Sequence, residues 1–314
     1  MTWKILITDG LEENGKAILR AAGEVNDAKG ITPEELLNDV GEYDALIVRG
    51  RTKVTDAVFA AGKKLKVVGR AGVGVDNIDL KAAAAHGVTA VNSPLATTVS
   101  VAELAMSMML AVVRDLARAD ASMKEGKWLK KEFEGNELYG KTLGVIGFGR
   151  IGVATAKRAA AFDMKVIAYD PLIPAAEIKA RGGEPVTLDE LLARADIITL
   201  HIPLTAESKN LLDASAFSKM KKGVYLVDAA RGGVVDEAAL LAALDSGHVA
   251  GAGLDVFTAE PVTEALMPLV RHPKVVCAPH IGAQTMEGQV RAAADIASEV
   301  VAALEGKPLR WKVA

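Results

Sequence analysis

Three side chains that together could move a proton and bind a carboxylate stand in three short segments of this chain. His280 lies in CAPHIGAQT, Glu260 lies twenty residues upstream in DVFTAEP, and Arg231 lies in LVDAARGGVVDE. A carboxylate hydrogen-bonded to an imidazole fixes its tautomer and favours its charged form, which suits a histidine to acid/base work. A guanidinium offers a bidentate fork to a carboxylate. The set predicts proton transfer at a hydroxyl or carbonyl next to a carboxylate.

Each of these residues follows an apolar run that is typical of a strand, and ligands bind where parallel strands end. Glu260 or Arg231 taken alone could equally be a solvated surface charge, but residues after three successive strands favour a site. His201 ends another such run in LHIPLT, where it would line the nicotinamide pocket. Asp255, in GLDVF, is expected either to support the cofactor or catalytic groups or to cap a turn.

A glycine fingerprint, GFGRIG, follows the apolar run LGVI and opens an alanine-rich helix. Its first glycine permits a tight turn, the second lets the backbone approach a pyrophosphate, and the third lets helix and strand pack. The free N–H groups of the helix N-terminus would then face the anion. The expected cofactor-binding residues of this turn are Gly147, Gly149, Arg150, Ile151 and Gly152.

An acidic residue ends the next predicted strand. Asp170 comes eighteen residues after Gly152, where its carboxylate could accept hydrogen bonds from both adenosine ribose hydroxyls and repel a 2′-phosphate. The pattern therefore favours NAD over NADP, although the cation Arg150 beside the pyrophosphate weakens that preference. The alternative is that the glycines only serve packing and that Asp170 caps the turn before Pro171.

Short β-branched runs alternate with Ala/Leu-rich stretches along the whole chain, which predicts an α/β protein with parallel sheets covered by helices. We expect two doubly wound domains, a Rossmann-type dinucleotide-binding domain of residues 98–284 and a smaller flavodoxin-like substrate domain. The smaller domain would be discontinuous, formed from residues 1–97 and 285–314, because the last helix is expected to return to it. The expected strands are 5–8, 45–48, 66–68 and 88–91, then 143–146, 165–169, 197–201, 224–227, 253–256 and 275–277.

The helical stretch 98–126 and the polar segment after it are interpreted as a connector between the domains. The 314 residues carry a formal charge of only −3 and no long basic block, so nucleic acid is not an expected partner. A single cysteine, Cys277, predicts neither a disulfide nor a zinc site, and no metal is expected. With no secretory signal and no apolar stretch that could span a bilayer, a cytoplasmic protein without a membrane partner is expected.

The fingerprint and the segments DAARGGVVDEAALLAAL, GAGLDVFTAEP and APHIGAQT resemble consecutive signatures of the D-2-hydroxyacid dehydrogenase family. With VRGRTKVT and VVGRAGVGVDNIDL, the similarity covers nearly the whole chain and is greatest to the phosphoglycerate dehydrogenases of that family. The resemblance implies that Arg231 binds the substrate carboxylate and carbonyl, that Glu260 orients His280, and that His280 exchanges the proton. The implied reaction is NAD-dependent oxidation of 3-phosphoglycerate, a step of serine biosynthesis.

The resemblance also implies substrate-binding loops in the first domain, with two arginines for the phosphate. Solvated charges at strand ends are the alternative reading of these arginines. Three departures concern the substrate: Asp228 where asparagine is common, Arg51 where a small residue is common, and SPLATTVS after Asn92. The implied substrate-binding residues are Arg49, Gly50, Arg70, Gly72, Val73 and Gly74.

Two other functions stay open. The same chemistry could act on an unphosphorylated 2-keto acid such as hydroxypyruvate or glyoxylate, or the fold could serve an NAD-sensing binding protein without catalysis. The family implies a homodimer formed through the cofactor domain, plausibly through the apolar helix 101–113, although an internal core helix would look alike. Because the sequence ends at residue 314, regulation through a C-terminal serine-binding domain is not expected.

Overall fold

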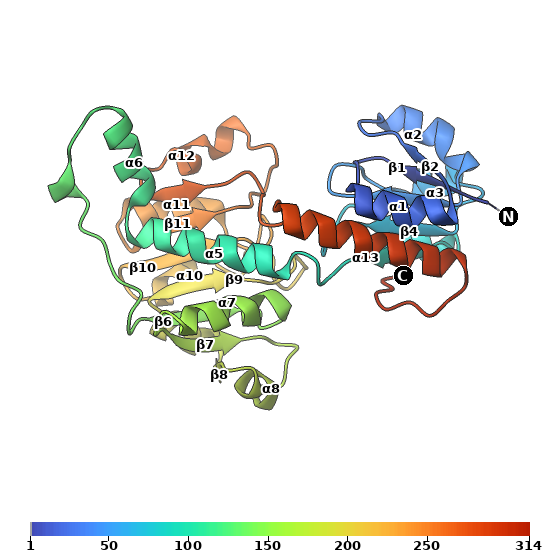
Figure 1. The fold of residues 1–314 in the computed structure, drawn as a ribbon. Coiled ribbons are helices and arrows are strands. Elements are labelled where there is room, and N and C mark those ends of the chain that lie inside the picture. Colours follow the sequence, from blue (N-terminus) through green and yellow to red (C-terminus); the bar gives the residue numbers. More distant parts are fainter. Residues whose placement is uncertain (1) are drawn as a thin grey trace. The chain divides into compact units, whose positions relative to one another are not determined.

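The computed structural model describes residues 2–314, which form two compact units. The first consists of residues 2–98 with Ala283–Ala314, and the second of Val99–Gly282. Both are parallel sheets covered by helices, so the predicted α/β class is confirmed (Figure 1). Every helix in the described part of the chain is too short or too polar to cross a bilayer.

The sheet of the first unit has five parallel strands in the order β2-β1-β3-β4-β5, the flavodoxin-like arrangement that the sequence predicts. Apart from β2, its strands are mostly apolar and buried, and β3 is buried along its whole length. Parallel strands buried on both faces need such continuous apolar runs. The bounds are β1 Trp3–Ile7, β2 Gly23–Asp27, β3 Ala45–Val48, β4 Val67–Arg70 and β5 Thr89–Asn92.

Strand β2 is missing from the sequence prediction, which gives this sheet four strands. Its sequence GEVND is polar and its residues are exposed or only partly buried, because it lies at the edge of the sheet and pairs with β1 alone. The bounds of β1, β4 and β5 differ from the predicted ones by one or two residues. An edge strand buries too little apolar surface to leave an alternating or continuous apolar pattern.

Helix α13 (Met286–Leu304) covers one face of this sheet together with α1 (Glu13–Ala22), and Figure 1 shows the two side by side. Their close approach depends on Gly15, where a Cβ atom would lie 2.6 Å from the carbonyl oxygen of Ala293. Further residues of the same C-terminal segment pair with β5, at the other edge of the sheet, since Val91 and Lys312 form an antiparallel bridge. The other face is covered by α2 (Pro33–Asp39), η1 (Val40–Glu42), α3 (Asp56–Ala61) and α4 (Leu80–Ala85).

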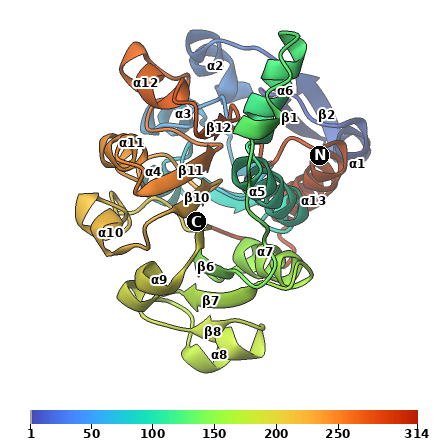
Figure 2. The ribbon, with the colours of Figure 1, turned by 90° about the vertical axis from the view of Figure 1, so that its left-hand side faces the viewer.

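The second unit has a seven-stranded parallel sheet in the order β12-β11-β10-β9-β6-β7-β8. Read from β8, this is the 3-2-1-4-5-6 order of a dinucleotide-binding fold with one more strand, β12, at the far edge. Figure 2 shows β6, β7 and β8 following one another toward α8. The bounds are β6 Thr142–Ile146, β7 Lys165–Tyr169, β8 Glu184–Pro185, β9 Ile197–Leu200, β10 Val224–Asp228, β11 Val249–Leu254 and β12 Val275–Cys277.

Two strand predictions are wrong in this sheet. The strand expected at 253–256 runs over Val249–Leu254, since its Ala/Gly-rich start gives no β-branched signal while Gly253 packs closely on Met108. The sequence predicts six strands for this sheet, and the additional strand, β8, has only two residues. The helices of this sheet are α7 (Arg150–Ala160), α8 (Ala175–Ala180), α9 (Leu188–Arg194), α10 (Ala214–Lys219), α11 (Glu237–Asp245), η3 (Glu264–Leu266) and α12 (Met267–Val270).

The stretch 98–126 is helical, as predicted, but it is not one continuous connector. It forms two helices, α5 (Thr98–Val113) and α6 (Leu116–Lys124), which are broken where Asp115 adopts the left-handed conformation with φ 51°. Helix α5 belongs to the core of the second unit, because its alanines and methionines are buried against β6, β7 and α7. Its apolar character therefore comes from internal packing. A short turn, η2 (Lys130–Glu132), interrupts the polar segment that follows.

Candidate active site

The glycine turn joins β6 to α7 and meets three different steric demands. Gly147 has φ +92°, and a Cβ there would lie 2.5 Å from the carbonyl oxygen of His201. At Gly152 a Cβ would collide with the carbonyl oxygen of Gly147, so this glycine lets the helix lie against the turn. Around Gly149 no atom lies within 4 Å of where a Cβ would be, which leaves open space at the helix N-terminus.

The first turn of α7 is open to a ligand. No side chain caps it, Arg150 is exposed, and Ile151 is partly buried. Uncapped N–H groups and the helix dipole favour an anion at such an end. The turn therefore fits the pyrophosphate of a dinucleotide, with the close approach occurring at Gly149 rather than at the other two glycines.

Asp170, directly after β7, holds the glycine turn from the side. Its two carboxylate oxygens accept hydrogen bonds from the backbone N–H groups of Phe148, at 2.8 Å, and Leu172, at 2.9 Å. The side chain is partly exposed, so each oxygen keeps a lone pair for another donor. The structure thus shows Asp170 holding a turn, as the alternative interpretation expects, and a contact with the ribose hydroxyls stays a prediction.

His201 directly follows β9, next to the glycine turn. Its Nε2 lies 3.1 Å from the Thr199 hydroxyl, whereas the buried Nδ1 has no hydrogen-bond partner among the described residues. Burial lowers the pKa of His201 to about 3, so the ring is neutral at physiological pH. A neutral ring with one unsatisfied nitrogen fits a residue that lines a cofactor pocket better than one that exchanges protons.

The structure brings His280 and Glu260 together. The imidazole Nδ1 lies 2.6 Å from Glu260 Oε2, and the other carboxylate oxygen accepts the Phe257 backbone N–H at 3.1 Å. The hydrogen bond with Glu260 raises the pKa of His280, against an opposing effect of burial. Burial alone would raise the pKa of Glu260, but its hydrogen bonds from His280 and Phe257 outweigh that effect and lower it.

Asp255, just after β11, fixes the loop that carries this histidine. Its carboxylate accepts the backbone N–H groups of Ile281 and Gly282, each at 2.8 Å, and its own carbonyl oxygen accepts that of His280 at 2.8 Å. The loop is held in an uncommon shape, since His280 has φ 54°. Asp255 therefore orients the catalytic candidate, in agreement with a supporting role and not with a simple turn cap.

Arg231 lies in the loop after β10, partly buried. Its Nη1 donates to the carbonyl oxygen of Ala230 at 2.7 Å, and its positive charge acts on both Glu260 and His280. A cavity of about 440 Å³, mostly apolar, adjoins the histidine and the glutamate within the same unit. Imidazole, carboxylate and guanidinium thus lie together in the second unit, as the sequence prediction requires.

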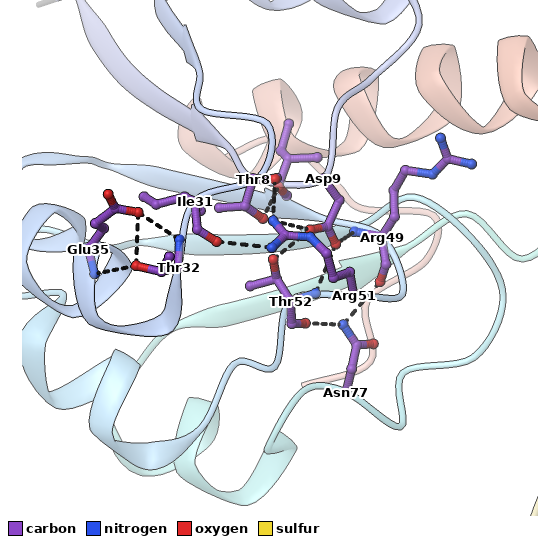
Figure 3. A network of polar contacts seen from close by, with 10 residues as sticks. Thr8, Asp9, Ile31, Thr32, Glu35, Arg49, Arg51, Thr52 and Asn77 are labelled. Carbon is purple, nitrogen blue, oxygen red and sulfur yellow. Dashed lines mark hydrogen bonds and ion pairs between the residues drawn. The ribbon is translucent and has the colours of Figure 1, made fainter. Parts of the chain in front are cut away.

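The predicted substrate loops of the first unit are shaped by residues that the sequence analysis did not single out. Asp9 accepts the backbone N–H groups of Arg49, at 2.8 Å, and Thr52, at 3.1 Å, as Figure 3 shows. Asn77 spans the same segment by donating to the carbonyl oxygens of Arg49 and Thr52. Burial alone would raise the pKa of Asp9, but the donors from Thr52 and Arg49 and the charge of Arg51 lower it.

Arg51, whose role the sequence left open, belongs to this network. Its guanidinium donates to the carbonyl oxygens of Thr8, at 2.8 Å, and Ile31, at 3.0 Å, and lies 3.1 Å from Asp9. Figure 3 shows the Arg49 side chain pointing away from that network. Its Nη2 donates to Gln284 at 3.4 Å and also to Gln289, both in the C-terminal segment of the same unit.

The second predicted substrate loop follows β4. At Gly72, φ is +150° and a Cβ would collide with the Arg70 guanidinium, so this glycine gives the arginine room. Asn92 donates to the carbonyl oxygen of Val73 at 2.7 Å and fixes the turn. Gly50 and Gly74 are at least partly exposed. No cluster of three potential metal ligands occurs in residues 2–314.

These features define a class: a dinucleotide-binding α/β fold with a carboxylate-bound histidine at its strand ends. The family model for the NAD-binding domain of D-isomer-specific 2-hydroxyacid dehydrogenases matches residues 106–282. The chain belongs to this family, which confirms the resemblance seen in its motifs, and NAD is the cofactor of the domain. The open N-terminus of α7 at Gly149 fits that cofactor.

Comparisons with individual proteins agree with the family. The chain is 48% identical over 97% of its length to D-3-phosphoglycerate dehydrogenase 2, chloroplastic, of Arabidopsis thaliana, covering 49% of that protein. It is also 48% identical over 97% of its length to D-3-phosphoglycerate dehydrogenase of Methanocaldococcus jannaschii, covering 58% of it. A glyoxylate reductase crystal structure from Paecilomyes thermophila has a TM-score of 0.91 and 30% identity, covering 99% of this chain and 98% of that one. The chain thus spans about half the length of the curated relatives it matches.

Proposed function

We propose that this chain oxidises 3-phosphoglycerate at C2 with NAD and gives 3-phosphohydroxypyruvate, a step of serine biosynthesis. The observation that carries the proposal is the 2.6 Å contact between His280 and Glu260, within the electrostatic reach of Arg231. Identity of 48% to phosphoglycerate dehydrogenases of two organisms supports the choice of substrate.

In this proposal His280 is the general base that accepts the proton of the C2 hydroxyl. Bound NAD supplies the acceptor for the hydride that leaves C2. Because Glu260 contacts Nδ1, the other nitrogen, Nε2, is the one that takes the proton of the C2 hydroxyl. The negative charge of Glu260 stabilises the imidazolium that forms. In the opposite direction, the protonated imidazole donates the same proton to the carbonyl oxygen.

The remaining site residues act by binding. Arg231 would hold the substrate carboxylate and the C2 oxygen, while Arg49 and Arg70 would bind the phosphate by charge-assisted hydrogen bonds. The loops that carry these two arginines would contribute Gly50, Gly72, Val73 and Gly74. The residues proposed to hold NAD are Gly147, Gly149, Arg150, Ile151, Gly152, Asp170, His201 and Asp255.

The test is a comparison of His280→Asn with the parent enzyme. General acid/base groups contribute about 10²–10⁴-fold, so turnover of 3-phosphoglycerate should fall by that factor. NADH affinity, measured by calorimetry, should stay within about twofold because the glycine turn and Asp170 are untouched. His248→Asn is the matched control, since this histidine bonds to the Met220 carbonyl oxygen elsewhere in the same unit. Near-normal turnover of His280→Asn would exclude the proton-transfer role.

Reduction of an unphosphorylated 2-keto acid is the second candidate. It is favoured by the similarity to a glyoxylate reductase and by the Arg49 guanidinium already being bonded to Gln284 and Gln289. Arg49→Ala and Arg70→Ala separate the two. If they raise KM for phosphohydroxypyruvate at least tenfold and leave hydroxypyruvate unchanged, the phosphorylated substrate stands. Equal effects on both substrates would favour the second candidate.

We further propose that the protein is a cytoplasmic homodimer formed through its cofactor unit. Exposed apolar side chains beyond α5, namely Leu116, Met123 and Trp128, support a surface there, while α5 itself is occupied by internal packing. The lone cysteine agrees with a reducing compartment. Light scattering after size exclusion should give twice the 32.8 kDa chain mass, and Trp128→Glu should shift the measured mass toward that of a single chain. A parent protein that elutes as a monomer would contradict the dimer.

A further inference from the structure

Two acidic side chains lie buried at the ends of adjacent strands in the second unit. Asp228 ends β10 and is 2% exposed, and Asp255 follows β11 and is 1% exposed. The backbone N–H of Asp255 donates to the carbonyl oxygen of Asp228 at 2.8 Å, so the strand ends are directly joined. Asp255 organises the loop of His280, and Asp228 occupies the equivalent place on the neighbouring strand.

Asp228 braces the loop that carries Arg231. Its Oδ1 accepts the backbone N–H of Ala230 at 2.9 Å, and the carbonyl oxygen of Ala230 accepts the Arg231 guanidinium at 2.7 Å. The carboxyl and the guanidinium therefore each hold one of the two peptide groups that flank the Cα of Ala230. Removing the carboxyl would leave the peptide N–H of Ala230 buried without this acceptor.

The charge state of Asp228 is open to change near neutral pH. Burial is the main effect and raises its pKa to about 7, and the negative charges of Asp255 on the neighbouring strand and Glu237 on α11 act in the same direction. The N–H of Ala230 and the positive charge of Arg231 oppose them. A neutral carboxyl still offers a carbonyl oxygen to the N–H of Ala230, so the brace survives protonation.

We propose that Asp228 is the positioning residue for Arg231, and that ionisation of its carboxyl weakens the hold of this guanidinium on an anionic substrate. An ionised carboxyl attracts the guanidinium to itself and repels the substrate carboxylate, whereas the neutral form only shapes the loop. The inference rests on the proposed function, which supplies the carboxylate-binding role of Arg231. It adds a residue that touches neither substrate nor cofactor.

Two substitutions separate shape from charge. Asp228→Asn keeps an acceptor for the N–H of Ala230 but cannot ionise, and Asp228→Ala loses both properties. Oxalate, a small dicarboxylate, is the probe, and its affinity for the NAD-saturated enzyme is measured by calorimetry between pH 6 and pH 8.5. All variants carry His280→Asn, so that imidazole titration does not contribute to the pH dependence. NADH affinity, measured alongside, reports on intact folding.

In the His280→Asn background the oxalate Kd should rise about tenfold as pH increases, which is the order expected for one charge near a partly buried guanidinium. With Asp228→Asn added, the Kd should stay at its low-pH value throughout. With Asp228→Ala added, it should be about tenfold higher at every pH, because the hydrogen bond that orients the loop is lost. NADH affinity should not change in any of them.

The outcomes that overturn the inference are distinct from failure of the proposed function. If Asp228→Asn retains the full pH dependence, or if Asp228→Ala binds oxalate as tightly as its parent at pH 6, Asp228 does not position Arg231. If instead Arg231→Ala leaves oxalate affinity unchanged, the carboxylate-binding role of Arg231 fails, and the proposed function fails with it. Should Asp228→Ala not fold, the asparagine variant alone still decides the question of charge.

Discussion

Replacing Glu260 with glutamine tests the acid/base pair most directly. The 2.6 Å contact with His280 is a charge-assisted hydrogen bond, and such bonds contribute about 1.5–3 kcal/mol. Both side chains are more than one third exposed, at 46% and 37%, so solvent screening places the effect near the lower limit. If the bond strengthens as the imidazole gains charge in the transition state, Glu260→Gln should lower kcat about tenfold.

The pH profile gives the sign of this effect. Glu260 raises the pKa of His280, so its neutralisation should move that pKa down. Oxidation needs a neutral imidazole and becomes faster as pH rises through the pKa, so this rise should move to lower pH in Glu260→Gln. Reduction needs the protonated imidazole and slows as pH rises, so that decline should also move to lower pH.

The assay is steady-state NADH absorbance in both directions between pH 5.5 and pH 10, with saturating substrates. Glu264→Gln is the matched control, because Glu264 lies in η3 of the same unit and has no acid/base role in the proposal. If the rise or the decline of the pH profile, here called its limb, stays in place in Glu260→Gln or moves to higher pH, the pairing is refuted as the cause of the raised His280 pKa. An unchanged limb with a tenfold loss of kcat would reduce Glu260 to a steric role.

Three further outcomes follow from contacts described above. Asp170→Ala should weaken NADH binding about tenfold in calorimetry, because it removes the brace of the glycine turn together with any ribose contact; unchanged affinity would remove Asp170 from the site. Gly152→Ala should cost about 1–3 kcal/mol in urea unfolding, since its Cβ collides with the carbonyl oxygen of Gly147, and native stability would contradict that packing. Asp9→Ala should cost about 3 kcal/mol, and Arg51→Ala, half exposed, less than about 1 kcal/mol; the reverse order would refute the central position of Asp9.

The sequence predicted best those strands whose residues form a buried run rich in β-branched and large apolar side chains. Strands such as Ala45–Val48 and Ile197–Leu200 are fully buried runs, and their alternation with helices indicates that they are parallel. The edge strand Gly23–Asp27 has no such run, and Val249–Leu254 consists mainly of alanine and glycine, with Gly253 packed closely on Met108. The sequence left open whether the apolar helix Thr98–Val113 packs internally or against a second copy, because composition does not tell which surface covers a helix.

The candidate site was predicted as far as strand ends can be located. His280 and Glu260 meet because both follow strands of one parallel sheet, a consequence of topology. The Asp9 network could not be found in this way, since its partners lie about forty residues away in the chain. Side-chain direction also escaped prediction: Arg49 bonds to Gln284 and Gln289, and Arg51 turns toward Asp9. Spacing gives the position of a side chain, but its partners depend on packing.

One device recurs at these strand ends and explains why the polar residues there divide into two kinds. Asp9, Asp170 and Asp255 each lie within two residues of a strand end and accept two backbone N–H groups, at least one of them from a neighbouring loop. A carboxylate has enough lone pairs to satisfy several such donors, whereas a neutral acceptor has fewer. Residues in the loops that these aspartates hold, such as His280, are then fixed through the backbone. Their side-chain polar atoms are not needed to hold the loop. A strand-end aspartate in this chain is therefore first a support for the backbone, and residues proposed to meet the substrate, such as Arg49 and His280, lie in the loops that it holds.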